Sequence, residues 1–309
     1  MKDKVMEQVE SSPSNIVVST VLLSKPGIIV SVAFTGFAGI VVAAKGLPSL
    51  SLIVLTIIAL LLSAAGSAIL NNVLDKQIDL LMNRLSKRAK ALEVVGEKTA
   101  IIIASFFIII SLVISFYYLN YVAALLIIAA ILSYTLLYTL YLKRSSPYGT
   151  ILGGIPGALP VLIGYAAIQP NIGLDGYILF AFMMLWQPPH FWALAQKYKL
   201  DYKKAGVPVM PVAKGAKFTN IMILIYSISL LPLSLSFWFL GYTSAYFAIL
   251  AIIFGGYFEY IIIKSTMTNS GYGKAFATSI FYMLGIMAAL ILDLSFNHGT
   301  AIATAMSLP

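Results

Sequence analysis

Nine long apolar segments constrain this chain more than any other feature of its sequence. They lie at 26–44, 49–71, 99–118, 121–141, 149–168, 175–195, 218–240, 244–263 and 275–293. A helix needs about 20 apolar residues to cross the hydrocarbon core of a bilayer, and each segment is near that length. Only 10% of the 309 residues are charged, which excludes a soluble globular domain or a disordered chain. We therefore predict an all-α membrane protein with nine transmembrane helices.

The positions of the basic residues predict how the helices are oriented. Nineteen of the 20 Lys and Arg residues fall before the first apolar segment, at 1–25, or in the connections 72–98, 142–148, 196–217 and 264–274, and Lys45 is the exception. Because basic loops remain in the cytoplasm, we expect a cytoplasmic N-terminus, cytoplasmic long loops and an outer C-terminus. This topology accounts for the net charge of +9, so nucleic acid is not an expected partner.

We expect three parts along the chain: a cytoplasmic segment at 1–24, a transmembrane domain at 25–293 and a short outer tail at 294–309. The first segment mixes acidic residues with lysines and lacks a cleavage-like site, so it looks like neither a secretory signal nor a transit peptide. This favours a multi-pass protein of a prokaryotic inner membrane. The absence of cysteine excludes thiol catalysis and thiolate metal sites.

The first candidate site follows the second apolar segment. Asn71, Asp75 and Asp79 are spaced four residues apart, so they share one face if the helix continues, with successive residues about 6 Å apart along the axis. Two carboxylates at that spacing can share Mg²⁺, and Asn71 adds a neutral oxygen ligand. Four basic residues come next: Arg84, Lys87, Arg88 and Lys90. Metal-binding carboxylates followed by guanidinium groups predict a diphosphate site. The alternative is solvated loop charge, with the aspartates paired to Lys76 and Arg84.

The second candidate site lies around His190 and Asp201, after the sixth apolar segment. They are eleven residues apart, so in a continuous helix His190 lies about 16 Å deeper than Asp201 on the same face. One elongated site would then combine an acidic rim with a deeper apolar cavity. The preceding Trp186-Gln187-Pro188-Pro189 is expected to weaken the helix. The alternative for His190 is a hydrogen-bonded structural role.

Two further groups of residues carry two interpretations each. Lys143 and Arg144 end the fourth apolar segment, where they either join the site or only mark the topology. Gly149, Gly153 and Gly157 have GxxxG spacing, which indicates close helix packing or, alternatively, a groove that faces the substrate.

These motifs resemble those of the UbiA superfamily of intramembrane prenyltransferases, and within it the family of protoheme IX farnesyltransferases. The superfamily resemblance rests on the first acidic motif and on the polar motif after the sixth helix. The narrower one rests on Lys25-Pro26-Gly27, Asp79-x-x-Met82-x-Arg84-x-x-x-Arg88, Lys143-Arg144 with Gly153-Gly154, Pro188-Pro189-His190-Phe191-Trp192 and Asp201-Tyr202-x-x-Ala205-Gly206-x-Pro208. The chain departs from the family at Leu85 and Ala89, where Thr and Pro are usual, and at Leu200, where a second acid usually precedes the tyrosine.

The resemblance implies nine helices around a central cavity, with the two polar loops above it. It implies transfer of a farnesyl group from farnesyl diphosphate to a vinyl group of heme B, which gives heme O for terminal oxidases. Both are substrates, the lipid bilayer is the medium, and heme-modifying or oxidase-assembly proteins are candidate partners. Mg²⁺ is the implied cofactor.

The resemblance also implies roles for individual residues. The implied metal ligands are Asn71, Asp75, Asp79 and Asp201, and the implied catalytic residues are Asp75, Asp79 and Arg84. The implied diphosphate-binding residues are Asn71, Arg84, Arg88, Lys143 and Arg144, and His190 is the implied heme-binding residue.

Two other functions stay open. A sister prenyltransferase that acts on a quinone precursor or a glycerol phosphate acceptor would keep the acidic motif but would not need His190. A transporter would use Asp75 and Asp79 as an ion path. Against a transporter, these acids lie at one mouth of the bundle, whereas transporter sites lie near the bilayer midplane.

Overall fold

The computed structural model describes residues 15–306, with side chains to residue 296, and all of its regular elements are helices. Nine helices in this part of the chain are long and apolar enough to cross a membrane. They coincide with the nine apolar segments, so the predicted fold class is confirmed. The spans are α3 (Pro26–Ala44), α4 (Leu50–Leu74), α7 with η2 (Glu97–Ile114, Ser115–Leu119), α8 with η3 and α9 (Tyr121–Leu132, Ser133–Leu142, Lys143–Ser145), α10 with α11 (Gly149–Leu152, Ile155–Ile168), α12 (Leu174–Lys197), α15 (Ala216–Phe239), α16 (Ala245–Thr268) and α17 (Tyr272–Met306).

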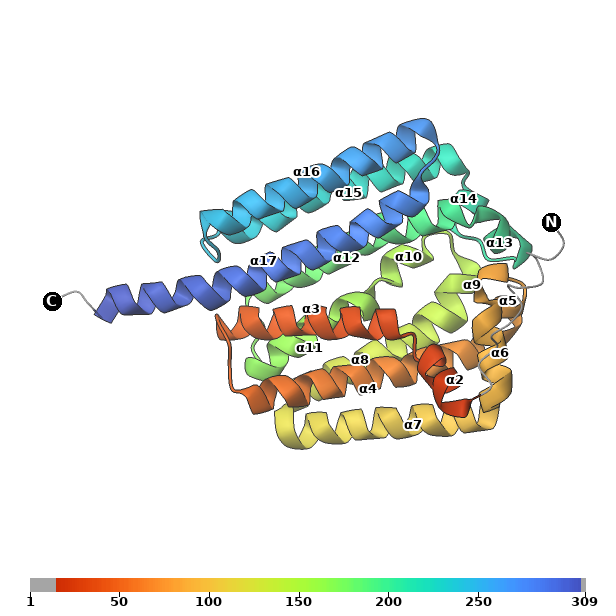
Figure 1. Ribbon diagram of the computed structural model, residues 1–309, viewed down its shortest axis with the longest axis horizontal. Helices are drawn as coiled ribbons and strands as arrows, with labels where there is room; N and C mark the ends of the chain where they lie inside the picture. Colours follow the sequence, from red (N-terminus) through yellow and green to blue (C-terminus); the bar gives the residue numbers. More distant parts are fainter. Residues whose placement is uncertain (1–14, 307–309) are drawn as a thin grey trace.

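The two long connections are helical, and they lie at the same end of the bundle (Figure 1). The first contains α5 (Lys76–Leu80), the 3-10 turn η1 (Asn83–Leu85) and α6 (Ser86–Val95), and the second contains α13 (Lys199–Lys204) and α14 (Met210–Ala213). Met82, Leu85 and Val207 form an apolar cluster that joins them. We call this end of the bundle the capped end.

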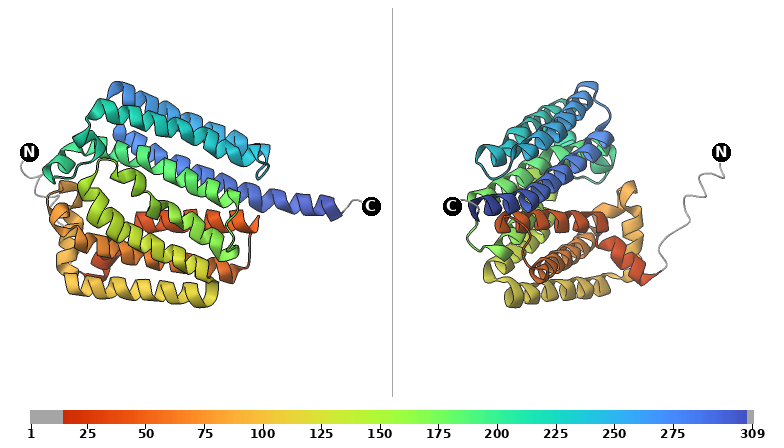
Figure 2. Two further views of the ribbon diagram at one scale, coloured as in Figure 1. Left: turned by 180° about the vertical axis from the view of Figure 1, so that it is seen from behind. Right: turned by 60° about the vertical axis from the view of Figure 1, so that its left-hand side comes forward.

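The chain before and after the bundle is described only in part. Of the predicted N-terminal segment, residues 15–24 are described, and they include the short helix α2 (Ile16–Leu23), which packs against α6. At the other end of the chain, α17 continues as a helix to Met306, into the predicted tail. Figure 2 shows that this end of α17 extends beyond the bundle on the side opposite the capped end.

Helices α3 and α11 pack backbone against backbone. A Cβ atom at Gly39 would overlap the Val161 carbonyl group, and one at Gly164 would overlap the Gly36 carbonyl group. In membranes, such small residues let helices approach closely where van der Waals packing drives association. The contact fixes α3, whose first turn follows directly on Lys25.

The glycines at GxxxG spacing also serve packing. A Cβ atom at Gly153 would overlap the Tyr138 ring, and one at Gly157 would overlap the Gln187 amide. The Gln187 amide in turn donates a hydrogen bond to the Gly154 carbonyl at 2.6 Å. These contacts favour the packing interpretation over the groove.

Helix α12 remains regular through Pro188 and Pro189, so the predicted weakening of the helix at this point is wrong. The prolines remove two backbone donors, but side chains just before them bind helices on two sides. Gln187 donates to Gly154, and the Trp186 indole donates to the Ser279 carbonyl of α17 at 2.7 Å. The helix ends instead at Lys197, because Tyr198 has φ −110° and ψ 29°.

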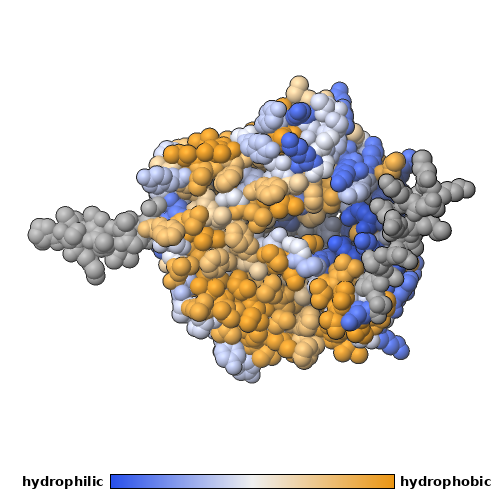
Figure 3. Space-filling model, viewed as in Figure 1, coloured by the Kyte–Doolittle hydropathy of each residue, from blue (hydrophilic) through white to orange (hydrophobic). Residues whose placement is uncertain are grey.

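The surface of the molecule separates the two environments. Figure 3 shows hydrophobic residues over the walls of the bundle and hydrophilic residues gathered at the capped end. The same view shows the surface hollowed between the two halves of the bundle, towards the capped end. A belt of apolar side chains around a helical bundle is what contact with lipid requires.

Candidate active site

The first acidic motif lies where α4 ends and α5 begins. Asp75 interrupts the helix, with φ −95° and ψ 4°. Helical hydrogen bonds still run from the Asp75 N–H to the Asn71 carbonyl and from the Asp79 N–H to the Asp75 carbonyl, both at 2.9 Å. The predicted four-residue register is therefore kept across the break. Asn71, Asp75 and Asp79 are buried, with exposed fractions of 5%, 1% and 6%.

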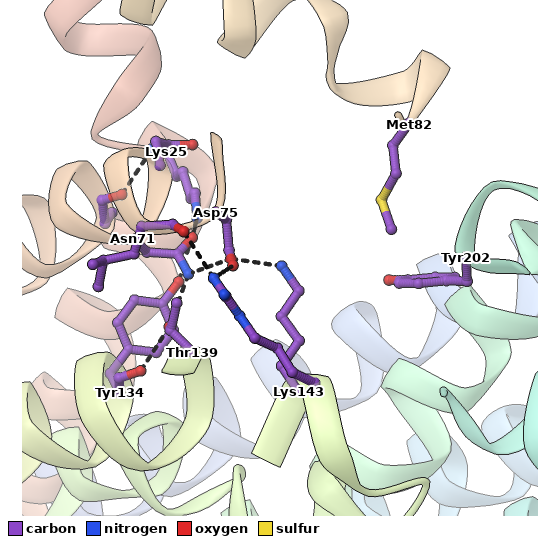
Figure 4. A network of polar contacts seen from close by, with 12 residues as sticks. Lys25, Asn71, Asp75, Met82, Tyr134, Thr139, Lys143 and Tyr202 are labelled. Atoms are coloured by element: carbon purple, nitrogen blue, oxygen red, sulfur yellow. Dashed lines mark hydrogen bonds and ion pairs between the residues drawn. The ribbon is translucent and has the colours of Figure 1, made fainter. Parts of the chain in front are cut away.

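The Asp75 carboxylate is paired with basic residues from the end of the fourth span. Lys143 Nζ lies 2.6 Å from Oδ2, and the Arg144 guanidinium lies 3.3 Å from Oδ1 (Figure 4). Arg144 also donates to the Leu74 carbonyl at 2.8 Å, which satisfies a carbonyl at the end of α4. Lys143 and Arg144 therefore join the acidic motif as well as fitting the topology pattern.

The alternative pairing of the aspartates is wrong. Lys76 pairs with Glu97 at 2.7 Å, away from the motif. Arg84 donates to the Tyr202 hydroxyl at 2.9 Å and pairs with neither aspartate. The buried aspartates are thus not solvated loop charge.

The π-helix η3 carries further polar groups to the site. Within it, the Thr139 hydroxyl donates to the Tyr134 carbonyl, five residues earlier, at 2.8 Å. Thr139 Oγ1 in turn accepts a hydrogen bond from Asn71 Nδ2 at 2.9 Å. π-Helices are rare and frequently occur at functional sites. Sequence reasoning missed Tyr134 and Thr139, since their spacing within an apolar segment carries no distinguishing pattern.

Lys25 reaches the motif from the start of α3. Its Nζ donates to Asn71 Oδ1 and, at 3.3 Å, to the Tyr134 hydroxyl. Burial, together with the positive charges of Arg88 and Lys143, lowers the pKa of Lys25 to about 7. The sequence marked Lys25 only as part of a family motif, because a lysine before a helix-starting proline is unremarkable by itself.

Asp79 has a different environment from Asp75. Its carboxylate forms no hydrogen bond and no ion pair with the residues that the structure describes. Burial raises the pKa of Asp79, and the nearby positive charges of Lys143, Lys25 and Arg88 oppose that rise. Burial likewise lowers the pKa of the Arg88 guanidinium. The Asp79 oxygens are not fully enclosed, so they are open to a ligand.

Arg84 connects the two halves of the cap. Its guanidinium carbon lies 5.3 Å from the ring centre of Tyr198 and 5.2 Å from that of Tyr202. Burial raises the pKa of Tyr202, so its hydroxyl remains a neutral acceptor. The buried Arg84 Nε has no partner among the described residues, which leaves one donor of the guanidinium free for a ligand.

Asp201 lies on α13, after the end of α12 at Lys197. The helix from His190 to Asp201 is therefore not continuous but is interrupted at Tyr198. Tyr198 and Tyr202, four residues apart, both contact Arg84. Within the described residues, no group of three or more acidic or histidine side chains is placed to hold a metal, so Asp201 is not gathered with Asp75 and Asp79.

His190 is buried in α12 and held on three sides. Its ring stacks on Trp186 at 4.4 Å and on Phe276 at 4.3 Å. Its Nδ1 lies 2.6 Å from Ser279 Oγ, and the Ser279 hydroxyl donates to the Phe276 carbonyl at 2.6 Å. Since a carbonyl only accepts, the serine proton is already used and Nδ1 must be the donor. A neutral imidazole in this tautomer keeps a lone pair on Nε2.

A small cavity adjoins these residues at the capped end. Its walls include Tyr138, Lys143, Thr150, Phe191, Tyr202 and Val209. Lys143 thus faces both the Asp75 carboxylate and this cavity. The site combines buried carboxylates, several cations and aromatic walls, a donor set that fits Mg²⁺ with a diphosphate.

The sequence model of the UbiA prenyltransferase family matches residues 32–281. The chain belongs to this family. Two similar proteins carry the name protoheme IX farnesyltransferase. The one from Geotalea uraniireducens (strain Rf4) is 43% identical over 254 residues, which cover 82% of this chain and 98% of the relative. The one from Aquifex aeolicus (strain VF5) is 37% identical over 289 residues, which cover 93% and 99%.

Solved structures confirm the UbiA fold. A digeranylgeranylglyceryl phosphate synthase has a TM-score of 0.73 at 19% identity, over 90% of this chain and 98% of that chain. A UbiA homolog from Archaeoglobus fulgidus bound to GPP and Mg²⁺ has a TM-score of 0.67 at 16% identity, over 87% and 99%. Membership of a prenyltransferase family removes the support for a transporter.

Proposed function

We propose that this protein transfers a farnesyl group from farnesyl diphosphate to a vinyl group of heme B, giving heme O. The observation that carries the proposal is the 43% identity to a protoheme IX farnesyltransferase of which 98% is covered. The buried acidic and basic groups of the site are the chemistry that the donor half of this reaction needs.

Asp75 and Asp79 are the proposed ligands of Mg²⁺. Of the two further ligands that the resemblance implies, Asp201 is not gathered with them, and Asn71 turns its amide NH₂ group towards Asp75. When bound, Mg²⁺ neutralises diphosphate charge and so makes diphosphate a better leaving group. Lys143 and Arg144 form ion pairs with Asp75, and they are also proposed to bind the diphosphate oxygens. Arg84 and Arg88 supply guanidinium groups, which match phosphate geometry in a bidentate manner.

The reaction needs no nucleophile from the protein. The bond between the farnesyl carbon and the diphosphate oxygen breaks, and both electrons leave with the diphosphate. The π-electrons of the heme vinyl group attack the allylic cation. Water adds to the resulting cation and releases a proton, which completes a hydroxyethylfarnesyl side chain. Aromatic walls such as Phe191 and Tyr138 keep other water from the first cation.

His190 is the proposed contact to heme iron. The Ser279 hydrogen bond and the Trp186 and Phe276 rings fix the plane of the imidazole, and the lone pair on Nε2 is suited to iron. An apolar setting suits a heme macrocycle better than it suits a phosphorylated acceptor.

Mass spectrometry of membrane hemes after expression in a host that lacks heme O tests the function. We expect heme O with the wild-type chain and none with Asp75→Asn. Absence of heme O, with a prenylated quinone precursor or glycerol phosphate product instead, would overturn the proposal in favour of a sister activity.

We also propose that the capped end faces the cytoplasm of a prokaryotic inner membrane. The chain has no cysteine, so single cysteines can be introduced at Lys90 and at Lys45 without interference. An impermeant thiol reagent added to intact cells should label the Lys45 position only. Labelling of the Lys90 position alone would reverse the orientation.

A further inference from the structure

We propose that Lys25 and Asn71 are a positioning pair: Lys25 holds the amide of Asn71, and Asn71 supports Asp75 as a hydrogen-bond donor instead of ligating the metal. The inference rests on the proposed function only in assigning Asp75 to Mg²⁺. It gives Asn71 a different task from the oxygen ligand that the sequence predicts, and it gives Lys25 a task for the first time.

The backbone at Lys25 is left-handed. Its φ is 58° and its ψ is 65°, and Pro26 follows it, which restricts the preceding residue further. Two other non-glycine residues in the described chain, Lys45 and Asn269, have positive φ. Both lie at the C-terminal ends of helices, where this conformation is common. Lys25 likewise lies directly after the C-cap of a helix, because Ser24 caps α2 and the Lys25 N–H donates to the Leu22 carbonyl at 3.2 Å. The left-handed turn between α2 and α3 thus sets where the Lys25 side chain enters the site.

The side chain of Lys25 is also in a costly position. It is 8% exposed, and it forms no ion pair within the described residues. Its ammonium lies against Asn71 Oδ1 and the Tyr134 hydroxyl, and 5.9 Å from the centre of the Tyr134 ring. A buried amino group is thus maintained for contacts with neutral oxygens.

The contact decides which way the Asn71 amide points. The Lys25 Nζ donates to the amide oxygen, and the Asp75 carboxylate, which can only accept, requires the Nδ2 group on the opposite side. The Nδ2 group then faces the opposite way, and it donates to Asp75 Oδ2 and to Thr139 Oγ1, both at 2.9 Å (Figure 4). Asn71 therefore presents hydrogens, not its oxygen, to the carboxylate that is proposed to bind Mg²⁺.

The experiment measures binding of Mn²⁺ by electron paramagnetic resonance, with inorganic pyrophosphate present, on the full chain in lipid nanodiscs. An aspartate at position 71 separates the two roles, because it is a better metal ligand than asparagine but cannot donate to Asp75. We expect Asn71→Asp and Lys25→Met each to weaken binding about tenfold, the effect of losing a hydrogen bond to a charged group. Lys25→Arg should recover most of the affinity.

Lys45→Met is the matched control. Lys45 has the same residue type and a similar backbone conformation at the other end of the same helix, but it is exposed, so we expect no change. Equal or tighter Mn²⁺ binding by Asn71→Asp would overturn the donor role of Asn71. Unchanged binding by a folded Lys25→Met variant would overturn the role of Lys25. Unchanged binding by Asp75→Asn would instead show that the metal assignment in the proposed function has failed.

Discussion

Asp75 and Asp79 are one helical turn apart, yet we expect the same substitution to change protein stability in opposite directions. Asp75 accepts hydrogen bonds from Lys143, Arg144 and Asn71. The Asp79 carboxylate has no such donor within the described residues, and its pKa is raised by burial. Replacing Asp75 by Asn therefore breaks a paired charge, whereas replacing Asp79 by Asn removes an unpaired one.

The magnitudes follow from the burial of the partners. Removing one member of a fully buried ion pair costs about 3–5 kcal/mol. Here the Lys143 and Arg144 side chains are 15% and 40% exposed, so water can partly replace the lost carboxylate. We expect Asp75→Asn to cost about 2 kcal/mol once this screening is included. We expect Asp79→Asn to stabilise the ligand-free protein by about 1 kcal/mol, because a buried amide is cheaper to desolvate than a carboxylate.

The dependence on pH gives an independent check on Asp79. A raised pKa means that the ionised form of Asp79 disfavours the folded state. This penalty is absent below the ordinary Asp pKa of about 4, grows as the pH rises from there to the raised folded value, and is constant above it. The advantage of Asp79→Asn over wild type should therefore shrink at acid pH.

Thermal unfolding in detergent with EDTA, at pH 7 and near pH 4, measures both effects, and farnesyl transfer is assayed in parallel. Both variants should lose turnover, because neither amide replaces the carboxylate charge at the metal. Equal destabilisation by the two substitutions would refute the contrast between the sites. Full activity of either variant, or of wild type in excess EDTA, would refute the metal assignment itself.

Three further predictions concern other parts of the molecule. Arg84→Leu should weaken farnesyl diphosphate binding more than acceptor binding, since a guanidinium contacts phosphate in a bidentate way. An unchanged rate at every diphosphate concentration would show that Arg84 only holds the two connections of the capped end together. His190→Ala should alter the absorption spectrum of bound heme and spare diphosphate binding, and a normal spectrum with normal turnover would make His190 structural. Gly39→Ala should destabilise the protein by about 2 kcal/mol because its Cβ would meet the Val161 backbone, whereas Gly256→Ala, with nothing within 4 Å, should not.

The fold and the acidic motif were predictable because both depend on local patterns. Apolar runs of fixed length defined the spans, and the four-residue spacing of Asn71, Asp75 and Asp79 survived even a break in the helix. Lys143 and Arg144, at the end of the fourth span, were identified as candidates from their residue type, but the sequence did not predict their contact with Asp75. Nothing within a single segment states which distant helix end will lie beside it.

The remaining features depend on contacts between distant parts of the chain. Lys25 meets Asn71 across 46 residues, and Arg84 meets Tyr202 across 118. The predictions that differ from the structure also concern contacts between distant parts of the chain. Local rules predicted a weakened helix at Pro188, where side-chain hydrogen bonds to other helices stabilise it. The depth of His190 below Asp201 was worked out for a continuous helix, whereas the helix is interrupted at Tyr198.

The ten-residue π-helix η3 makes the site sensitive to the number of residues in the fourth span as well as to their identity. An added residue is what widens α-helical turns into π turns, and each residue turns an α-helix by about 100°. Deleting one codon from 133–142, even that of the exposed Leu140, would therefore swing Lys143 and Arg144 away from Asp75. Loss of that one residue would be equivalent to removing both cations. Insertions and deletions in this segment should accordingly be tolerated far less than substitutions of its lipid-facing side chains.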